Sequence, residues 1–163
     1  MRIVKFAMRE ADEDDVAFIA GLFKFPHSRE FLNEPGRDAI LDLIEGTDGE
    51  AFIVEADGED FGYFTMRDRG WLMELGVLVV TATGHGAGPF AMRWGIEQAF
   101  QKRDAHRVSI EIREDNDRAR AMCERLGFKA EGLHRDGFCD AVTGKYKNLI
   151  PYGMLRTDLR PVT

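Results

Sequence analysis

Cysteine is scarce in this chain, and its scarcity excludes one class of fold. Only Cys123 and Cys139 occur among the 163 residues, too few for the disulfide framework of a small secreted domain. Residues 1–6 lack the long apolar core of a signal peptide, and the longest apolar run is too short to span a bilayer. We therefore expect a cytoplasmic protein with reduced thiols and no membrane association.

An excess of positive charge is also missing. The formal net charge is −7 at pH 7, which argues against nonspecific binding of nucleic acid and is compatible with a cationic substrate. No repeat, low-complexity tract or linker interrupts the chain, so its length predicts one domain over residues 1–163. The four acidic residues at 12–15 fit the negative-charge end of a helix better than a metal site, and we expect no metal.

Hydrophobic periodicity predicts strands and helices along the whole chain. Strands are expected at residues 2–8, 51–55, 61–66, 71–79, 108–112, 128–135 and 148–155, and helices at 13–23, 37–45, 89–102 and from about 116 to 126. Asp57-Gly58 predicts a hairpin turn, and residues 26–36 are expected to be irregular. In the third helix, Met92, Ile96, Ala99 and Phe100 form an inward stripe.

A glycine-rich loop directly follows the apolar strand that ends near residue 80. Glycines at 84, 86 and 88 let backbone N–H groups turn inward and let a bulky anion approach the main chain. Pro89 suits the first turn of the next helix, whose positive end points at the same anion. The loop is neither a dinucleotide fingerprint nor a P-loop, because Pro89 replaces the third glycine and no Gly-Lys-Ser/Thr follows. It therefore predicts a phosphate cradle.

Two segments together resemble the GCN5-related N-acetyltransferase (GNAT) superfamily. Thr83-Gly84-His85-Gly86-Ala87-Gly88 shares the glycine spacing of the family's pyrophosphate loop. Downstream, the strand at 108–112 and the helix from Asn116-Asp117-Arg118-Ala119 to Gly127-Phe128 resemble the family's fifth strand and the helix after it, with Gly127 as a left-handed end residue. Glu131-Gly132-x-x-Arg135 resembles a segment of the ribosomal-protein-acetylating (RimJ/RimL-like) branch.

The resemblance implies an α/β (α+β) fold, with a central mixed, mostly antiparallel seven-stranded sheet, helices on both faces, and splayed strands 4 and 5. It also implies an enzyme that transfers an acetyl group from acetyl-CoA to a primary amine by direct attack in a ternary complex, without a metal. Backbone at Leu78 and Val79 is expected to contact pantetheine and the thioester oxygen. The remaining cofactor-binding residues implied are Thr83, Gly84, His85, Gly86, Ala87, Gly88 and Asn116.

The sequence departs from the family pattern at two positions. Thr83 replaces the usual arginine or glutamine of the loop, which puts the strength of CoA binding in doubt. Cys123 stands where a tyrosine often protonates the leaving thiolate, and it is either a proton donor or a buried packing residue. The loss is tolerable, because a thiol with a pKa near ~8.5 leaves a thiolate that is easily protonated at neutral pH. His85 and Asn116 also have simpler explanations, as an exposed loop residue and a helix N-cap.

The general base and the acceptor are less defined. Glu74 and Glu111 lie on the two strands that frame the cleft of the family, although both also look like solvent-facing strand residues. A protein N-terminus is the acceptor suggested by the branch; a small amine, an amino acid, a polyamine or an antibiotic remain alternatives. Candidate residues for the acceptor cleft are Phe23, Phe25, His27, Phe31, Arg135 and Tyr146.

Two other functions stay open at this point. The departures at Thr83 and Cys123 suggest a noncatalytic sensor that binds acyl-CoA. A generic nucleotide-binding α/β domain is a third hypothesis, but it leaves the match at 116–128 unexplained. The chain is expected to be a monomer or a homodimer.

Overall fold

The computed structural model describes residues 2–47 and 49–161, in which strands and helices follow one another much as predicted. The strands are β1 (Phe6–Glu10), β2 (Glu50–Ala56), β3 (Glu59–Asp68), β4 (Leu72–Val80), β5 (Arg107–Arg113), β6 (Lys129–Ala130), β7 (His134–Cys139) and β8 (Tyr146–Leu155). The α-helices are α1 (Val16–Leu22), α2 (Pro26–Arg29), α3 (Arg37–Ile44), α4 (Ala87–Glu97) and α5 (Asp117–Leu126). Two 3-10 helices, η1 (Glu13–Asp15) and η3 (Arg156–Asp158), and a π-helix, η2 (Gln98–Lys102), which continues α4, complete the set.

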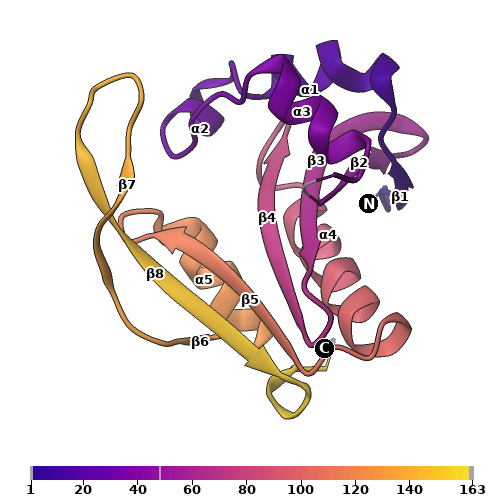
Figure 1. The fold of residues 1–163 in the computed structure, drawn as a ribbon. Helices are drawn as coiled ribbons and strands as arrows, with labels where there is room; N and C mark the ends of the chain where they lie inside the picture. Colours follow the sequence, from indigo (N-terminus) through magenta and orange to yellow (C-terminus); the bar gives the residue numbers. More distant parts are fainter. Residues whose placement is uncertain (1, 48, 162–163) are drawn as a thin grey trace. The chain divides into compact units, whose positions relative to one another are not determined.

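The strands form one mixed sheet in the order β1-β2-β3-β4-β5-β8-β6, with β7 paired to β8 (Figure 1). β4 and β5 are parallel, whereas β1–β2, β2–β3, β5–β8, β6–β8 and β7–β8 are antiparallel. The parallel register comprises three pairs, from Leu72↔Arg107 to Glu74↔Ser109, although β4 is nine residues long. The predicted mixed, mostly antiparallel sheet is confirmed.

The chain divides into two compact units. Unit 1 consists of Met1–Arg67 and Gly76–Trp94, and unit 2 of Asp68–Leu75 and Gly95–Thr163. The boundary passes through β4, whose first residues belong to unit 2 and whose last residues belong to unit 1. The glycine loop therefore lies in unit 1, and the start of α5 lies in unit 2.

Unit 1 has helices on both faces of its strands, because successive strand residues point to opposite sides. Ile53 and Tyr63 belong to a buried cluster with residues of α1 and α3. The adjacent residues along these strands, Phe52 and Phe64, face α4. Their ring centroids lie 4.7 and 6.5 Å, respectively, from the ring centroid of Trp94. The inward stripe predicted for helix 89–102 is also confirmed, since all four of its side chains are buried: Met92 and Ile96 of α4, and Ala99 and Phe100 of η2.

Turns and helix caps occur where short sequence motifs predict them. Asp57 and Gly58 connect β2 to β3 with φ of 51° and 83°, the left-handed pair that a tight two-residue hairpin requires. α5 ends at Gly127 with φ 109°, where a side chain is disfavoured. Both predictions are confirmed.

At three places the structure departs from the predicted elements by more than two residues. β1 begins at Phe6 rather than at residue 2, because Phe6 pairs with Ala56, the last residue of β2. The expected strand 128–135 divides into β6 and β7, with Gly132 at φ 141° between them, which gives eight strands instead of seven. Residues 26–29 form the short helix α2, which begins with Pro26 at a position that favours proline.

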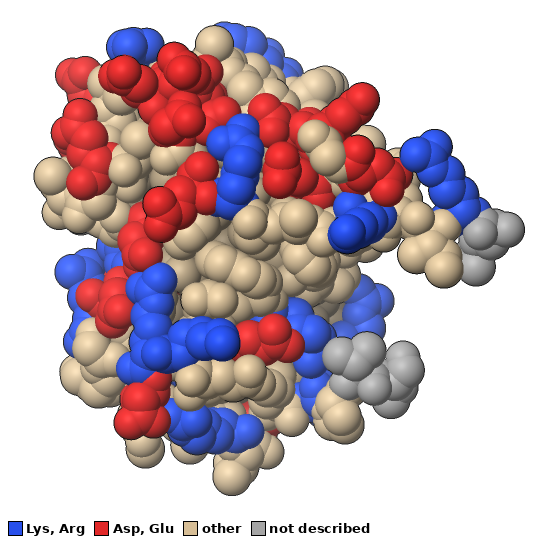
Figure 2. All heavy atoms as spheres, turned by 90° about the vertical axis from the view of Figure 1, so that its right-hand side faces the viewer, with Lys and Arg blue, Asp and Glu red and all other residues tan. Residues whose placement is uncertain are grey.

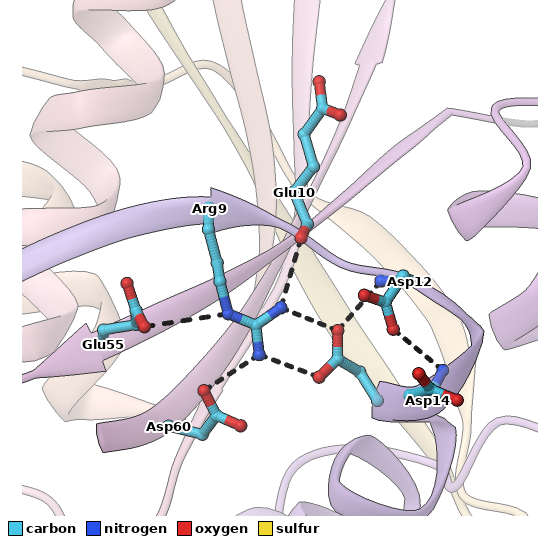
Figure 3. A network of polar contacts seen from close by, with 7 residues as sticks. Arg9, Glu10, Asp12, Asp14, Glu55 and Asp60 are labelled. Carbon is cyan, nitrogen blue, oxygen red and sulfur yellow. Dashed lines mark hydrogen bonds and ion pairs between the residues drawn. The ribbon is translucent and has the colours of Figure 1, made fainter. Parts of the chain in front are cut away.

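Arg9 on β1 ties the start of α1 to the sheet of unit 1 (Figure 3). Its guanidinium donates to both carboxylate oxygens of Asp15, at 2.9 and 2.8 Å, and to Asp60 Oδ1 at 2.9 Å. The Asp12 side chain caps the same turn by accepting from the Asp14 N–H, and the Asp12 N–H donates in return to the Asp15 carboxylate. The acidic run is therefore a helix start, as predicted.

Charge is unevenly distributed along the chain. Unit 1 contains sixteen acidic and eight basic residues, and unit 2 contains thirteen and fourteen. Figure 2 shows Asp and Glu side chains gathered in the upper part of one face.

None of the helices in residues 2–47 and 49–161 combines the length and apolar character needed to cross a membrane.

Candidate functional site

The glycine loop of unit 1 lies between the end of β4 and the start of α4. Gly84 and Gly86 adopt φ of 83° and 88°, a left-handed conformation that L side chains rarely adopt. Helix α4 begins at Ala87, so Pro89 lies in its first turn as predicted, and the Phe90 N–H already bonds to Gly86 O at 3.2 Å. The first N–H groups of a helix have no partner within the helix, so the amino end of α4 offers donors next to the loop.

The main chain at Gly86 is open to a ligand. A Cβ placed there meets only Phe6 Cε2, at 3.7 Å, within ordinary contact distance. The segment from Gly76 to Trp94 also contains no Asp or Glu, and Arg93 is its one charged residue apart from His85. Space at Gly86 and the backbone donors of a segment that itself contains no carboxylate together fit an anion such as a pyrophosphate.

His85 is exposed in the loop, and its ring also lies beside an aromatic ring of β3. Its ring lies 6.0 Å from that of Phe61 on β3, edge to face. The two rings border a cavity of about 390 Å³ lined by Arg2, Val4, Phe6, Ala56, Asp57, Glu59, Phe61 and His85. The contact with Phe61 gives His85 a packing role that does not involve phosphate. A contribution of its charge to phosphate binding therefore stays a prediction.

Backbone direction distinguishes the two residues predicted to contact pantetheine. The Val77 N–H bonds to Thr65 Oγ1 and the Thr81 N–H to Phe61 O, so both face β3. The Val79 carbonyl also faces β3, because it lies 2.8 Å from a Cβ placed at Gly62. Alternation along the strand turns the N–H and C=O of Leu78 toward the opposite edge. The Leu78 N–H therefore does not face β3, and its contact with a thioester oxygen stays a prediction.

Unit 2 brings the two candidate bases to one face of its sheet. Glu74 pairs with Ser109, and Glu111 follows two residues later on the same side of β5. The Glu74 carboxylate accepts from Arg69 Nε at 3.2 Å, and Glu111 Oε1 lies 3.7 Å from His134 Nδ1. Both side chains are more than a third exposed, so both carboxylates are open to solvent.

Cys123 is fully buried in α5. Burial, followed by the nearby charge of Glu124, raises the pKa of its thiol to about 12. A thiol in these surroundings stays protonated at neutral pH and packs as a small hydrophobic side chain. The environment favours the packing interpretation over proton donation.

A tyrosine that the sequence did not single out lies beside the same helix. Tyr152 of β8 is buried, and its hydroxyl accepts from Arg120 Nε and donates to Glu124 Oε1, each at 3.2 Å. Burial raises the pKa of Tyr152, and the Arg120 contact acts in the opposite direction. Unit 2 thus has a hydrogen-bonded phenol next to α5 although Cys123 replaces the tyrosine of the family pattern.

Asn116 is the N-cap of α5. Its side-chain oxygen accepts from the Ala119 N–H at 3.2 Å, which satisfies one of the free donors of the first turn. This contact confirms the capping interpretation, and a contact with the cofactor stays a prediction.

The acceptor candidates lie in different surroundings. Phe23 belongs to the buried core of unit 1, whereas Phe25 is partly exposed and stacks on His27 at 5.5 Å. His27 Nε2 donates to Val80 O at 2.8 Å, so α2 is fastened to the carboxyl end of β4. In unit 2, Tyr146 is 64% exposed. Phe25 and His27 are thus brought close to the strand that leads into the glycine loop.

The predicted residues fall into two groups. Unit 1 holds the backbone and loop residues from Leu78 to Gly88, and unit 2 holds Glu74, Glu111, Cys123 and Asn116. Within the described ranges, no three His, Cys, Asp or Glu side chains are grouped so that they could hold a metal ion. The sequence did not single out Thr65 or Tyr152, nor did it indicate that His27 bonds to the end of β4. Each of these residues contacts an element that is distant in the chain.

Comparison with known proteins gives consistent matches. The family model described as acetyltransferase (GNAT) domain matches residues 5–129. A putative ribosomal N-acetyltransferase, YdaF of Bacillus subtilis (strain 168), is 36% identical over 75 residues, which cover 46% of this chain and 40% of that protein. The match thus spans about two fifths of the length of this curated relative.

Solved structures share the fold. A probable acetyltransferase has a TM-score of 0.78 at 24% identity, with 94% of each chain covered. The structure of yncA, a putative acetyltransferase from Salmonella typhimurium with its cofactor acetyl-CoA, has a TM-score of 0.73 at 18% identity, with 92% of this chain and 93% of that chain covered.

Proposed function

We propose that this chain, which belongs to the acetyltransferase (GNAT) domain family, transfers an acetyl group from acetyl-CoA to a primary amine. One observation carries the proposal: the glycine loop, left-handed at Gly84 and Gly86, opens onto the first turn of α4 within a segment free of carboxylates. Backbone N–H groups arranged in this way bind phosphate.

Acetyl-CoA supplies an activated thioester carbonyl, and the chain supplies the contacts. Loop N–H groups hold the pyrophosphate, and the Leu78 N–H donates to the thioester oxygen as negative charge develops there. The acceptor nitrogen forms its bond to the carbonyl carbon, and the carbon–sulfur bond breaks. The attacking nitrogen gives up one further proton to water or to the base as the amide forms, and the thiolate takes a proton from solvent or from a neighbouring group. Protonation of the sulfur is undemanding, because a thiol has a pKa of ~8.5.

The amine has to lose a proton before it attacks, and the cost depends on the acceptor. Deprotonating a lysine-like amine of pKa ~10.4 at pH 7 costs about 4.6 kcal/mol, whereas a chain-terminal amine of pKa ~8 costs about 1.4 kcal/mol. Glu74 is our preferred base and Glu111 the second candidate. Since each is paired with a basic side chain and open to solvent, a water molecule between carboxylate and amine suits both.

A protein or peptide N-terminus is our preferred acceptor. The relative YdaF is named as a putative ribosomal N-acetyltransferase, and Glu131-Gly132-x-x-Arg135 resembles the same branch. The acidic surface of unit 1 attracts a cationic acceptor of any kind, so small amines and polyamines are the alternatives to be tested.

Release of CoA thiol tests this function directly. Wild-type protein is mixed with acetyl-CoA and, in turn, a short peptide, the same peptide with a blocked N-terminus, and spermidine. We expect turnover of the free peptide alone. Turnover of spermidine or the blocked peptide without the free one contradicts the N-terminal acceptor, and acetyl-CoA binding without thiol release from any amine identifies a sensor instead of an enzyme.

A further inference from the structure

Thr65 of β3 inserts its hydroxyl into the backbone pairing with β4. The residue is 4% exposed, and its Oγ1 accepts a hydrogen bond from the Val77 N–H at 2.8 Å. In a regular sheet, the partner of such an N–H is a backbone carbonyl of the neighbouring strand. A side chain has replaced that carbonyl at this point.

Gly76 supplies the space that this arrangement needs. A Cβ at Gly76 would overlap Thr65 Oγ1 and would lie 3.4 Å from the Thr65 carbonyl oxygen. Any side chain at position 76 would therefore force Thr65 or the strand to move. Gly76 does not have a positive φ, so room, and not backbone freedom, requires glycine here. Gly76 and Val77 therefore both face the single residue Thr65, and two residues opposite one define a β-bulge.

The bulge decides which backbone groups face outward in the last part of β4. Beyond it, the Val77 N–H, the Val79 carbonyl and the Thr81 N–H all face β3. By alternation the Leu78 N–H points to the other edge. A slip of one residue at the bulge would exchange these directions and turn Leu78 toward β3.

We propose that Thr65 is a positioning residue for acetyl transfer: its hydroxyl, together with the missing side chain of Gly76, holds the bulge that presents the Leu78 N–H to the thioester oxygen. The inference rests on the proposed function. Thr65 touches no reacting atom and acts through Val77 and Leu78. Without the hydroxyl, the part-buried Val77 N–H loses its partner, and a shift of the strand toward a regular ladder gives that N–H a new one.

Three substitutions separate this role from a purely structural one. Thr65→Val keeps the shape and removes the acceptor, Thr65→Ser keeps the hydroxyl, and Thr47→Val removes another threonine hydrogen bond, from Thr47 Oγ1 to Asp42 O. We expect Thr65→Val to lower kcat by about 10- to 100-fold while KM for acetyl-CoA changes by less than about threefold, as displacement of an oxyanion donor predicts. Thr65→Ser should restore kcat, and Thr47→Val should leave it unchanged.

A second measurement needs no turnover. Acetyl-CoA labelled with ¹³C at the thioester carbonyl should shift its carbonyl resonance on binding wild type and Thr65→Ser, because the oxygen accepts a hydrogen bond. The shift should be reduced in Thr65→Val at saturating ligand. If Thr65→Val remains folded with wild-type kcat and a wild-type carbonyl shift, Thr65 has no positioning role although the proposed function stands. If the wild type neither binds nor uses acetyl-CoA, the proposed function is overturned, and this role with it.

Discussion

The two units of the chain differ in charge and in the kind of chemistry they carry. Unit 1 has twice as many acidic as basic residues, yet it contains the glycine loop, whereas unit 2 is almost balanced and holds the candidate carboxylates and the buried thiol. In unit 1 the acids all precede residue 68, and the stretch from Gly76 to Trp94 contains none. Under the proposed function, anion binding therefore depends on short-range backbone donors, while the wider acidic surface is compatible with a cationic acceptor.

The largest effect is expected from a substitution in the loop of unit 1. Gly86→Val places a branched side chain at φ 88° in the path of the pyrophosphate, and we expect kcat/KM for acetyl-CoA to fall by at least about 100-fold. Gly58→Val is the matched control, because Gly58 has φ 83° and nothing within 4 Å of its Cβ. It should share the backbone strain of the loop variant but not its loss of activity; equal losses would contradict the cradle.

The carboxylates of unit 2 should matter according to the acceptor and the pH. For a peptide α-amine, Glu74→Gln should cost little at pH 8 and more at pH 6.5, since the protonated fraction of the amine rises as pH falls. For a lysine-like amine, the loss should reach about 10²–10⁴-fold throughout that range. The pH dependence of turnover, measured in the same way for Glu111→Gln, decides between the two bases. If neither variant alters the profile, neither carboxylate is the base, and water accepts the proton.

Cys123→Ala should have a smaller effect on turnover. If the thiol only packs, kcat should fall by less than about tenfold, while a small cavity lowers the free energy of unfolding by about 1 kcal/mol. The control is Cys139→Ala, because Cys139 is exposed and should change neither quantity. A hundredfold drop in kcat at unchanged stability would instead show that the thiol takes part in the reaction.

The smallest effect on activity is expected at the Arg9 network of unit 1. Its contact with Arg9 holds the pKa of Asp15 below its ordinary value of 3.8, so the stabilisation is complete above that value and is lost as pH falls through the lower native pKa. Asp15→Asn should therefore lower the free energy of unfolding by about 2 kcal/mol at pH 7. In urea titrations the difference from wild type should shrink in acid, with Asp14→Asn as control. A difference that grows in acid would contradict this account.

Much of the fold was predictable because its signals are local. Gly127 after an amphipathic helix, the Asp57-Gly58 turn and the acidic start at 12–15 each need only a few neighbouring residues to be interpreted. The glycine spacing at 84–88 likewise indicates the loop from the sequence alone. The strand expected at 128–135 failed because alternation continues through Gly132, whereas the backbone turns there with φ 141°.

The parts of the site that escaped prediction depend on contacts across the fold. Thr65 and Val77 are twelve residues apart, and Tyr152 reaches Arg120 from 32 residues away. Neither pair produces a periodic pattern, since only the packing of strands and helices brings the partners together. The direction in which the backbone N–H and C=O groups of Leu78 and Val79 point could not be predicted either. A bulge reverses these directions without changing the hydrophobic pattern of the strand.

Amide chemical shifts provide the most direct test of the anion site in unit 1. Uniformly ¹⁵N-labelled wild-type protein is titrated with CoA and, separately, with inorganic pyrophosphate. The account predicts that the amides of Gly84, Gly86 and Gly88 shift with both ligands and saturate together. Shifts absent from this loop, or confined to residues lining the cavity beside His85, would contradict it.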